Sequence, residues 1–428
     1  MRAGTLEDNI LVFLATSGTI AKKALHAPFS KYNARYYSTA YCSLLKDGYI
    51  EENKTNRRLM TRLTRKGTAI VRENHPERNI APIPASKDYM RKRRQQMLSG
   101  AAAVLSASGI IVSGAFKPDM MALKRGMDES SADNSQEVKK FKRAVKGGLF
   151  INSTELKALC RETDGSSDYL YAARLLGVIL FQGRVLYVYN LADKVIELFP
   201  KREQKTIDAI EKVLSQISCI CDAVKFRDSR SCILLSTSKA MLAKVYLSKT
   251  ERTGKKGEKE RLERWTAVHA TYPTLSMLFD KIYYASCDAN GAKMIRDVKR
   301  LSVVDPCNAL LKRLGCKEDG NCYYMAFEPN LGGVIIPMPV IDICELDAYV
   351  KECISTQQQV ILYAHKYYAD VLSRCFGPCL HEFRDSESLE PVDVYRYDSS
   401  GNPVGDSYME ALKYNTHKEA GHFETRGK

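Results

Sequence analysis

The sequence predicts a protein of mixed class, α+β in its first part and α/β in its C-terminal region. Two observations carry this prediction. Apolar residues recur at helical spacing through the first 48 residues, and a short hairpin pattern and a further helix then follow. From about residue 148 onward, short apolar strands alternate with amphipathic helices, which is the order typical of an α/β arrangement.

Length and composition set the predicted domain plan. A chain of 428 residues is too long for one ordinary domain, and 45% hydrophobic residues suffice for a substantial core. No run of 18 apolar residues occurs, and acidic residues come early in "MRAGTLEDN", so we expect a soluble, cytoplasmic protein without a membrane partner. The predicted regions are an N-terminal domain at 1–84, a basic connecting helix with a flexible linker at 85–147, a mixed α/β domain at 148–391 with a charged insertion near 250–265, and a polar tail at 392–428.

Positive charge is concentrated at one end of the chain. Residues 1–146 hold 27 Lys and Arg against 13 Asp and Glu, whereas the remaining 282 residues hold 38 against 37. Nearly the whole net charge of +15 therefore belongs to the first third. Such asymmetry favours a polyanionic partner for that region.

Three helices are predicted first. "TLEDNILVFLATSG" (Thr5–Gly18) begins with a threonine cap and acidic residues in its first turn. "TIAKKALHA" (Thr19–Ala27) reads as a short second helix. In "KYNARYYSTAYCSLLKDG" (Lys31–Gly48), three apolar side chains share one face, and the final glycine lies where a helix should end.

The hairpin after the third helix completes the pattern. "YIEEN" and "RRLMTRLT" read as two strands around the turn "KTN", and "RKGTAIVREN" as a fresh helix. Three helices, a hairpin and a closing helix predict a winged helix-turn-helix, whose wing would bring Lys54, Arg57 and Arg58 to phosphate or to the minor groove.

The outer face of the third helix supplies the candidates for reading bases. Arginine and asparagine can make paired hydrogen bonds to guanine and adenine edges, and threonine can contact a thymine methyl group. The predicted DNA-contacting residues here are Lys31, Asn33, Arg35, Tyr36, Thr39 and Ser43. The alternative is that these are solvated polar positions on a helix that contacts protein.

A second basic helix is predicted over Ala85–Ala107, after the proline-rich "APIPA". Its "RKRR" stretch covers a helical turn, so we expect Arg91, Arg93 and Arg94 to contact phosphate, with a merely solvated turn as the alternative. Residues 117–148 are poor in β-branched residues and read as an exposed loop or linker.

Catalytic signatures are weak. Glu155, Asp193 and Glu197 follow the order of the acids in a restriction-like nuclease core, where carboxylates hold magnesium. Glu197 is not followed by the expected x-Lys, so a degenerate core is the favoured interpretation. The chain also lacks a phosphate-binding GxxxxGK[ST] loop and a GxSxG elbow.

Thirteen scattered cysteines favour reduced, mostly buried thiols over a metal site. The sharper alternative is a site formed by Cys375, Cys379 and His381, but no second cysteine–histidine pair completes it. We therefore expect neither a metal nor a cofactor.

The stretches "LLKDGYI…LTRKG" and "FINSTELKAL…ARLLGVILFQGRVLYVYN", with the basic helix between them, resemble the replication-relaxation family of bacterial plasmids and conjugative elements. The resemblance implies a DNA-binding accessory to the replication or mobilisation of such an element. We therefore expect a double-stranded DNA partner, with replication or mobilisation proteins and a homodimer as further partners. A magnesium-dependent nuclease and a protein-interaction scaffold are the alternatives.

Overall fold

The structure is a computed structural model, and it shows a mixed α+β protein. It describes residues 4–29, 32–55, 58–76, 89–113, 117–125, 132–164, 174–191, 198–224, 226, 229–246, 271–301, 305–315, 326–328, 333–398 and 403.

The chain divides into two compact units. Unit 1 comprises Met1–Ser238 and Pro273–Arg296, and unit 2 comprises Lys239–Tyr272 and Asp297–Lys428. In the described residues, unit 1 contains helices and two sheets, and unit 2 contains helices and one sheet. No helix within the described ranges combines the length and the apolar character that crossing a membrane requires.

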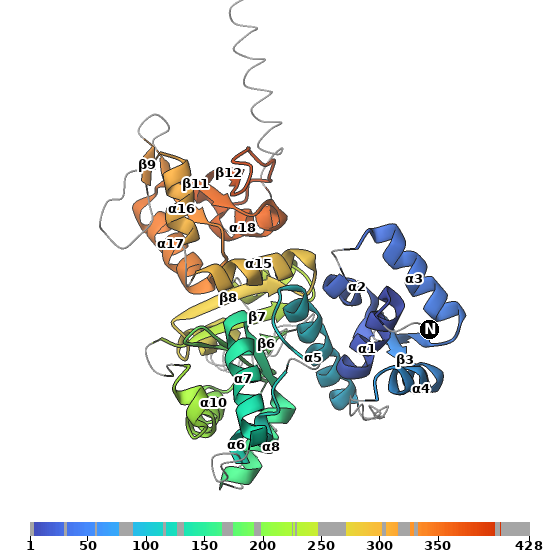
Figure 1. Ribbon diagram of the computed structural model, residues 1–428. Coiled ribbons are helices and arrows are strands. Elements are labelled where there is room, and N and C mark those ends of the chain that lie inside the picture. The colour runs from blue at the N-terminus through green and yellow to red at the C-terminus, as the bar shows by residue number, and fades with distance from the viewer. Residues whose placement is uncertain are drawn as a thin grey trace, which may run out of the picture. The chain divides into compact units, whose positions relative to one another are not determined.

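The N-terminal segment of unit 1, residues 4–76, contains helices packed around a small antiparallel sheet (Figure 1). Its strand order is β1-β3-β2, with Ile20 paired to Thr61 and Ile50 to Leu63. In chain order its elements are α1 (Leu6–Ser17), β1 (Ile20–Ala21), α2 (Lys22–Leu25), the 3₁₀ helix η1 (Ala27–Phe29), α3 (Ala34–Lys46), β2 (Ile50–Thr55), β3 (Arg58–Leu63) and α4 (Arg65–Asn74).

The first helix forms as predicted, and the second does not. The Thr5 side chain caps α1 by accepting a hydrogen bond from the backbone N–H of Asp8 at 3.3 Å, and Gly18 follows its last turn. The predicted helix over Thr19–Ala27 is instead a strand of two residues and a single helical turn. Its first residues pair with β3 at the edge of the hairpin, because this long-range pairing outweighs local helical spacing.

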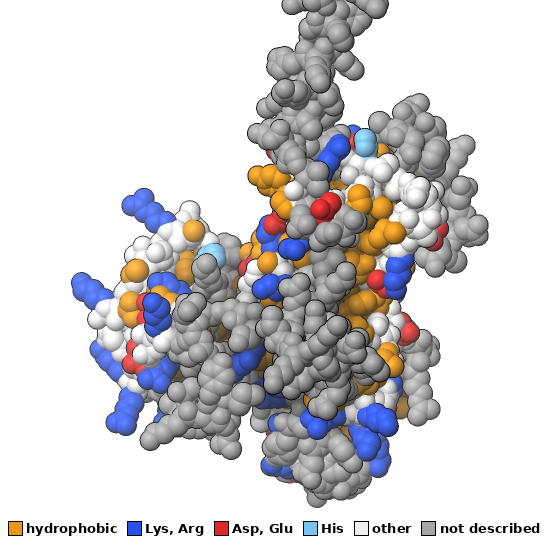
Figure 2. Space-filling model, turned by 180° about the vertical axis from the view of Figure 1, so that it is seen from behind, with side chains coloured by type: hydrophobic (Ala, Val, Ile, Leu, Met, Phe, Trp, Pro, Cys, Tyr) orange, Lys and Arg blue, Asp and Glu red, His pale blue; other side chains and the backbone are white. Residues whose placement is uncertain are grey.

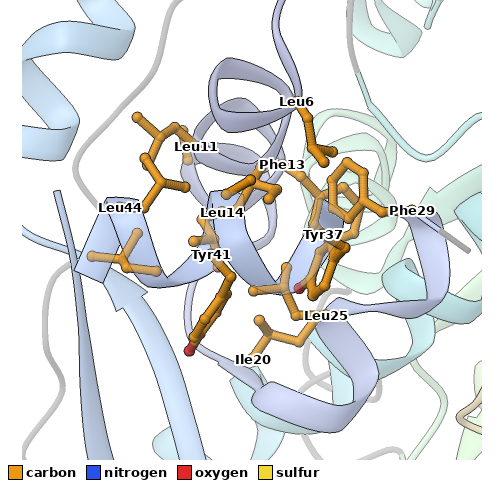
Figure 3. Close-up of a cluster of buried hydrophobic side chains, with 14 of the residues drawn as sticks. Leu6, Leu11, Phe13, Leu14, Ile20, Leu25, Phe29, Tyr37, Tyr41 and Leu44 are labelled. Carbon is orange, nitrogen blue, oxygen red and sulfur yellow. The ribbon is translucent and has the colours of Figure 1, made fainter. Parts of the chain in front are cut away.

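A single apolar core holds the N-terminal segment together (Figure 3). Side chains from every helix of the segment meet there, and aromatic rings stack within it, with centroids 5.9 Å apart for Phe29 and Tyr37. Burial of large apolar side chains is the dominant stabilising contribution to such a core. The residues labelled in the figure are Leu6, Leu11, Phe13, Leu14, Ile20, Leu25, Phe29, Tyr37, Tyr41 and Leu44.

Three helices follow: α5 (Tyr89–Ala107), α6 (Met120–Arg125) and α7 (Ala132–Gly147). The predicted loop over 117–148 was wrong for most of its described residues, because α6 and α7 lie within it. Phe141, Ala144 and Val145 are buried, so a sparse apolar stripe among lysines is enough to pack α7 against the sheet that follows.

The second part of unit 1 is a five-stranded sheet of order β4-β5-β6-β7-β8. The first three strands form an antiparallel meander, and β7 and β8 continue parallel to β6. Gln182 and Gly183 form the turn between the second and third of these strands, with φ of 41° and 82°. The elements are β4 (Leu149–Asn152), α8 (Ser153–Asp164), β5 (Gly177–Phe181), β6 (Arg184–Asn190), α10 (Pro200–Ser215), α11 (Ser218–Cys221), β7 (Ser231–Ser236), α14 (Thr271–Ser276), β8 (Lys281–Ser286) and α15 (Ala289–Arg300).

Unit 2 contains a four-stranded sheet of order β12-β11-β10-β9. Strands β10, β11 and β12 are parallel and are joined through helices, which agrees with the alternation of strands and helices expected for this region. The charged insertion near 250–265 lies outside the described residues. The elements are α12 (Ala240–Tyr246), α16 (Pro306–Arg313), β9 (Ala326–Glu328), β10 (Gly333–Met338), α17 (Ile343–Thr356), β11 (Gln359–Ala364), η2 (Lys366–Tyr368), α18 (Ala369–Phe376), η3 (Gly377–Cys379) and β12 (Leu380–Asp385).

Candidate nucleic-acid interface

Helix α3 has a defined start and a sharp end. The Asn33 side chain caps it by accepting a hydrogen bond from the Arg35 backbone N–H at 2.8 Å. At the other end Gly48 has a φ of 72°, its N–H donates to the carbonyl of Leu45, and the next N–H, that of Tyr49, donates to the carbonyl of Leu44. Glycine adopts this left-handed conformation without the strain that a side chain brings, so the predicted helix stop at Gly48 is confirmed.

The hairpin is closed at its base by the "LTRKG" phrase. Thr64 caps α4 by accepting from the Gly67 N–H at 3.0 Å, and its hydroxyl also reaches the carbonyl of Gly48 at 2.7 Å. A Cβ atom on Gly67 would lie 2.1 Å from the carbonyl oxygen of Tyr49, closer than any real contact. The glycine is therefore required for α4 to pack directly against the start of the hairpin.

The two faces of α3 differ in burial. Tyr37, Ala40, Tyr41 and Leu44 point into the core, as the helical spacing predicted for three of them. The opposite face is exposed and polar, and 51% of the Tyr36 surface is accessible. The exposed residues of this face that the sequence singled out are Arg35, Tyr36, Thr39 and Ser43.

Two hydroxyls on the exposed face already donate within the helix. Thr39 Oγ1 donates to the Arg35 carbonyl at 3.0 Å, and Ser43 Oγ donates to the Asp47 carboxylate at 3.2 Å. Each hydroxyl oxygen therefore presents its lone pairs outward, as an acceptor. The side-chain oxygen of Asn33 already accepts the hydrogen bond of the helix cap. This weakens the prediction that the Asn33 amide makes paired hydrogen bonds to adenine.

A polar network fixes α3 to the sheet. The Tyr41 hydroxyl donates to Glu52 at 2.6 Å and lies 2.6 Å from the hydroxyl of buried Thr61, while Lys22 forms an ion pair with Glu52 at 2.9 Å. Burial, reinforced by the negative charge of Glu52, raises the pKa of Tyr41, so the phenol stays protonated and keeps donating. The network sets the orientation of the exposed face relative to the hairpin.

The charges on the hairpin are partly neutralised. Glu51 pairs with Arg62, and Glu52 with Lys22, so the acids of β2 have cationic partners inside the segment. Lys54 is exposed on β2, opposite Leu59, which is 40% exposed. Lys31 and Arg57 lie outside the described residues, as does the side chain of Arg58.

Helix α1 is tied to the end of α4 by a buried carboxylate. Asp8, only 1% exposed, accepts hydrogen bonds from the Gly4 N–H at 2.8 Å, Asn74 Nδ2 at 3.0 Å and His75 Nε2 at 2.9 Å. Burial by itself would raise the pKa of Asp8, but these hydrogen bonds and the charge of His75 together hold it below its usual value. The ionised Asp8 carboxylate therefore joins the start of α1 to the end of α4.

The cations of α5 do not form one outward row. Arg93 is half-buried, and the side chain of Arg91 lies outside the described residues. Arg94 was expected to contact phosphate, but its guanidinium donates to the Leu175 carbonyl at 2.9 Å within unit 1. The reason is that α5 packs on the N-terminal segment and also contacts β6, so this helical turn lies against protein.

The described residues give no support to a magnesium site formed by Glu155, Asp193 and Glu197. Glu155 accepts hydrogen bonds from Lys117 Nζ at 2.7 Å and from the Asn152 N–H at 2.8 Å, which assigns it a structural role at the start of α8. Asp193 and Glu197 lie outside the described residues. In the described part of the chain, no cluster of three or more His, Cys, Asp or Glu side chains is arranged to hold a metal ion.

The alternative metal site of Cys375, Cys379 and His381 gains no support either. Cys375 and Cys379 are buried, and burial raises the pKa of the Cys375 thiol to about 12. These two cysteines and His381 are among the described residues, where no group of three or more side chains is arranged to hold a metal ion.

Two exposed features beside α3 were not anticipated from the sequence. Lys66, in the first turn of α4, donates to the Asp47 carbonyl at 2.9 Å and lies over the Tyr49 ring. Leu59 adds an apolar side chain to the hairpin next to Lys54. The "LTRKG" phrase could have indicated the position of Lys66, since this lysine lies in the helical turn just after the Thr64 cap. The alternation of residues within β3 gives no signal that Leu59 is exposed.

The arrangement presents a short helix with an arginine, a tyrosine and two hydroxyls outward, next to a hairpin that carries the exposed Lys54. Blue side chains project from the N-terminal segment at the left of Figure 2. Such a surface has hydrogen-bond donors, acceptors and positive charge within one small area. In comparisons with protein families, curated proteins and solved structures, nothing matched this chain.

Proposed function

We propose that the N-terminal segment is a winged helix-turn-helix that binds duplex DNA, with α3 in the major groove and the hairpin as the wing on the phosphate backbone. The observation that carries the proposal is the exposed polar face of α3, held beside the hairpin by the hydrogen bond from Tyr41 to Glu52 of β2. An α-helix fits the major groove, where each base pair shows a distinct pattern of donors and acceptors.

Each side chain has a role in this proposal. Arg35 donates to guanine, Thr39 and Ser43 accept from base amino groups or meet a thymine methyl group, and Tyr36 packs against sugar or base edges. Lys54 contacts phosphate and fixes the register of the protein on the duplex. The charge excess of residues 1–146 supplies attraction that does not depend on sequence.

The wider function is an accessory or regulatory role in the replication, mobilisation or transcription of a mobile element. The support is the resemblance of the "LLKDGYI…LTRKG" and "FINSTELKAL" stretches to the replication-relaxation family, together with the basic N-terminal third. The five-stranded sheet and unit 2 then serve oligomerisation or contacts with replication or mobilisation proteins. The proposed setting is the cytoplasm.

Titrating the full-length chain with a labelled random-sequence duplex tests the proposal, with the affinity measured by fluorescence anisotropy at several salt concentrations. If several phosphates are neutralised, the logarithm of the affinity falls linearly and steeply with the logarithm of salt concentration. Absence of binding at low salt would favour the protein-interaction alternative. Plasmid nicking that requires magnesium and is lost in Glu197→Ala would favour the nuclease.

A further inference from the structure

The register of the hairpin divides its side chains between the two sides of the small sheet. Directly opposite residues of β2 and β3 point to the same side, and that side alternates along each strand. Ile50 is paired with Leu63, and their side chains belong to the apolar core or pack against it, together with those of α3. This pair therefore identifies the side of the sheet on which α3 lies.

Two further pairs lie on that side, nearer the tip of the hairpin. Glu52 is opposite Thr61, and the Tyr41 hydroxyl of α3 lies 2.6 Å from a side-chain oxygen of each. The next pair on the same side is Lys54 and Leu59, and both are exposed, Leu59 over 40% of its surface. Helix α3 thus covers the sheet as far as Thr61, and the exposed pair lies just beyond it.

The exposed face of α3 is directed away from this side of the sheet. Tyr41 points from the helix to the sheet, whereas Arg35 and Thr39 lie about 120° and about 160° around the helix from Tyr41, at about 100° per residue. A duplex that lies on Arg35 and Thr39 is therefore on the same side of the sheet as Lys54 and Leu59. Such a duplex faces the exposed pair as well as the helix.

The chemistry of the pair fits a DNA groove. A single exposed leucine is ordinary on a protein surface, but this one is directly opposite a lysine. The Cβ atoms of opposite residues are about 5 Å apart, and the minor groove is about 6 Å wide, so Lys54 can contact phosphate at the rim while Leu59 points into the groove. Leucine cannot form hydrogen bonds with base edges, but it can enter between two base pairs.

We propose that Leu59 is an apolar wedge that enters the minor groove beside α3, partly unstacks one base step and kinks the duplex. The proposal rests on the proposed function of the N-terminal segment, and it adds the class of DNA that the segment takes. Unstacking costs least at pyrimidine–purine steps such as TA and CA. The preferred ligand is therefore a duplex with a flexible step of this kind under the hairpin.

Energy transfer between dyes at the two ends of a short duplex tests the proposal in the full-length chain. The duplex is one that the wild-type protein selects from a random pool, and the protein is present at saturation. The wild type should bend it by about 20–90°. Leu59→Ala should bind the same duplex and leave it straight, and Leu59→Met, which keeps a long apolar side chain, should retain the bend.

The cross-strand partner provides the matched control. Lys54→Ala should bind more weakly, because a phosphate contact is lost, but it should bend the duplex as the wild type does once saturated. Circular dichroism of each variant verifies that its helices are formed. A second readout replaces each adenine of the duplex in turn by 2-aminopurine, whose fluorescence rises when the base unstacks. The rise should occur at one step in the wild type and be lost in Leu59→Ala.

The class of DNA is tested by replacing the unstacked step with a run of adenines, which is stiff. The wild-type affinity should fall about tenfold, and Leu59→Ala should bind both duplexes alike.

The outcomes separate the wedge from the proposed function. Binding without a bend in the wild type, or an equal bend in the wild type and Leu59→Ala, would overturn the wedge and leave duplex binding by α3 intact. If the wild type binds no duplex at low salt, the proposed function fails and the wedge fails with it.

Discussion

Two glycines frame the hairpin, and replacing each by alanine should destabilise the protein for a different reason. At Gly67 the added Cβ would lie 2.1 Å from the Tyr49 carbonyl oxygen and 3.1 Å from a Leu63 methyl group. That oxygen also accepts hydrogen bonds from the N–H and the hydroxyl of Thr64, both at 3.1 Å. Relief of the clash must therefore move backbone that is already hydrogen-bonded.

The magnitude follows from three contributions at Gly67. Overpacking costs about 1–3 kcal/mol, and each weakened hydrogen bond costs about 1 kcal/mol. Alanine returns about 1 kcal/mol through its higher helix propensity. With both hydrogen bonds weakened, we expect Gly67→Ala to lower the free energy of unfolding by about 2–4 kcal/mol.

Gly48 provides the contrast. Its Cβ would meet nothing within 4 Å, but its φ of 72° is unfavourable for alanine, so Gly48→Ala should cost about 1–2 kcal/mol. Asparagine tolerates this conformation, so Gly48→Asn should be milder, whereas Gly67→Asn should be no better than Gly67→Ala.

Urea unfolding followed by circular dichroism measures these differences, and hydrogen exchange of peptides covering α3 and β2 locates them. If Gly67→Ala is as stable as the wild type, α4 does not pack on the Tyr49 carbonyl and the account of the hairpin base is wrong. Equal behaviour of the two asparagine variants would contradict the separation of steric and conformational causes.

Three further predictions concern the same segment. Tyr41→Phe leaves the carboxylate of Glu52 and the buried hydroxyl of Thr61 without the phenol, so the free energy of unfolding should fall by about 1–3 kcal/mol in urea titrations. Asp8→Asn should destabilise the protein at pH 7 by a similar amount. Because the folded pKa of Asp8 is lowered, its contribution is complete above the ordinary value of 3.8 and is lost as pH falls through the folded value, so the difference from wild type should shrink below pH 3.8. Lys54→Ala should weaken binding to all duplexes alike and reduce the salt slope by about 1, as measured by anisotropy, and a change confined to one sequence would contradict a phosphate contact.

Local chemistry made much of the N-terminal segment predictable. Thr5 and Gly48 carry cap and stop signals that act within a few residues, so the bounds of α1 and the end of α3 follow from the sequence. Tyr37, Tyr41 and Leu44 were expected on one face and are buried there. In unit 2, strands and helices alternate as expected, and β10, β11 and β12 pair in parallel.

The remaining features depend on contacts between distant residues. Strand β1 forms because Ile20 pairs with Thr61, 41 positions later in the chain, and local helical spacing gives no sign of that pairing. Helix α7 was missed because its buried positions, among them Phe141, are few among the lysines. The inward direction of Arg94 depends on the entry to β5, which only the fold brings next to α5.

The most direct test of DNA reading by α3 is the affinity of Arg35→Ala for two duplexes, one selected by the wild-type protein from a random pool and one unrelated. The expected loss on the selected duplex is about 1–3 kcal/mol, with little change on the unrelated one. Lys244→Ala, which removes an exposed positive charge from unit 2, is the matched control and should bind both as the wild type does. Equal affinities of Arg35→Ala and wild type for the selected duplex would contradict base reading by this helix.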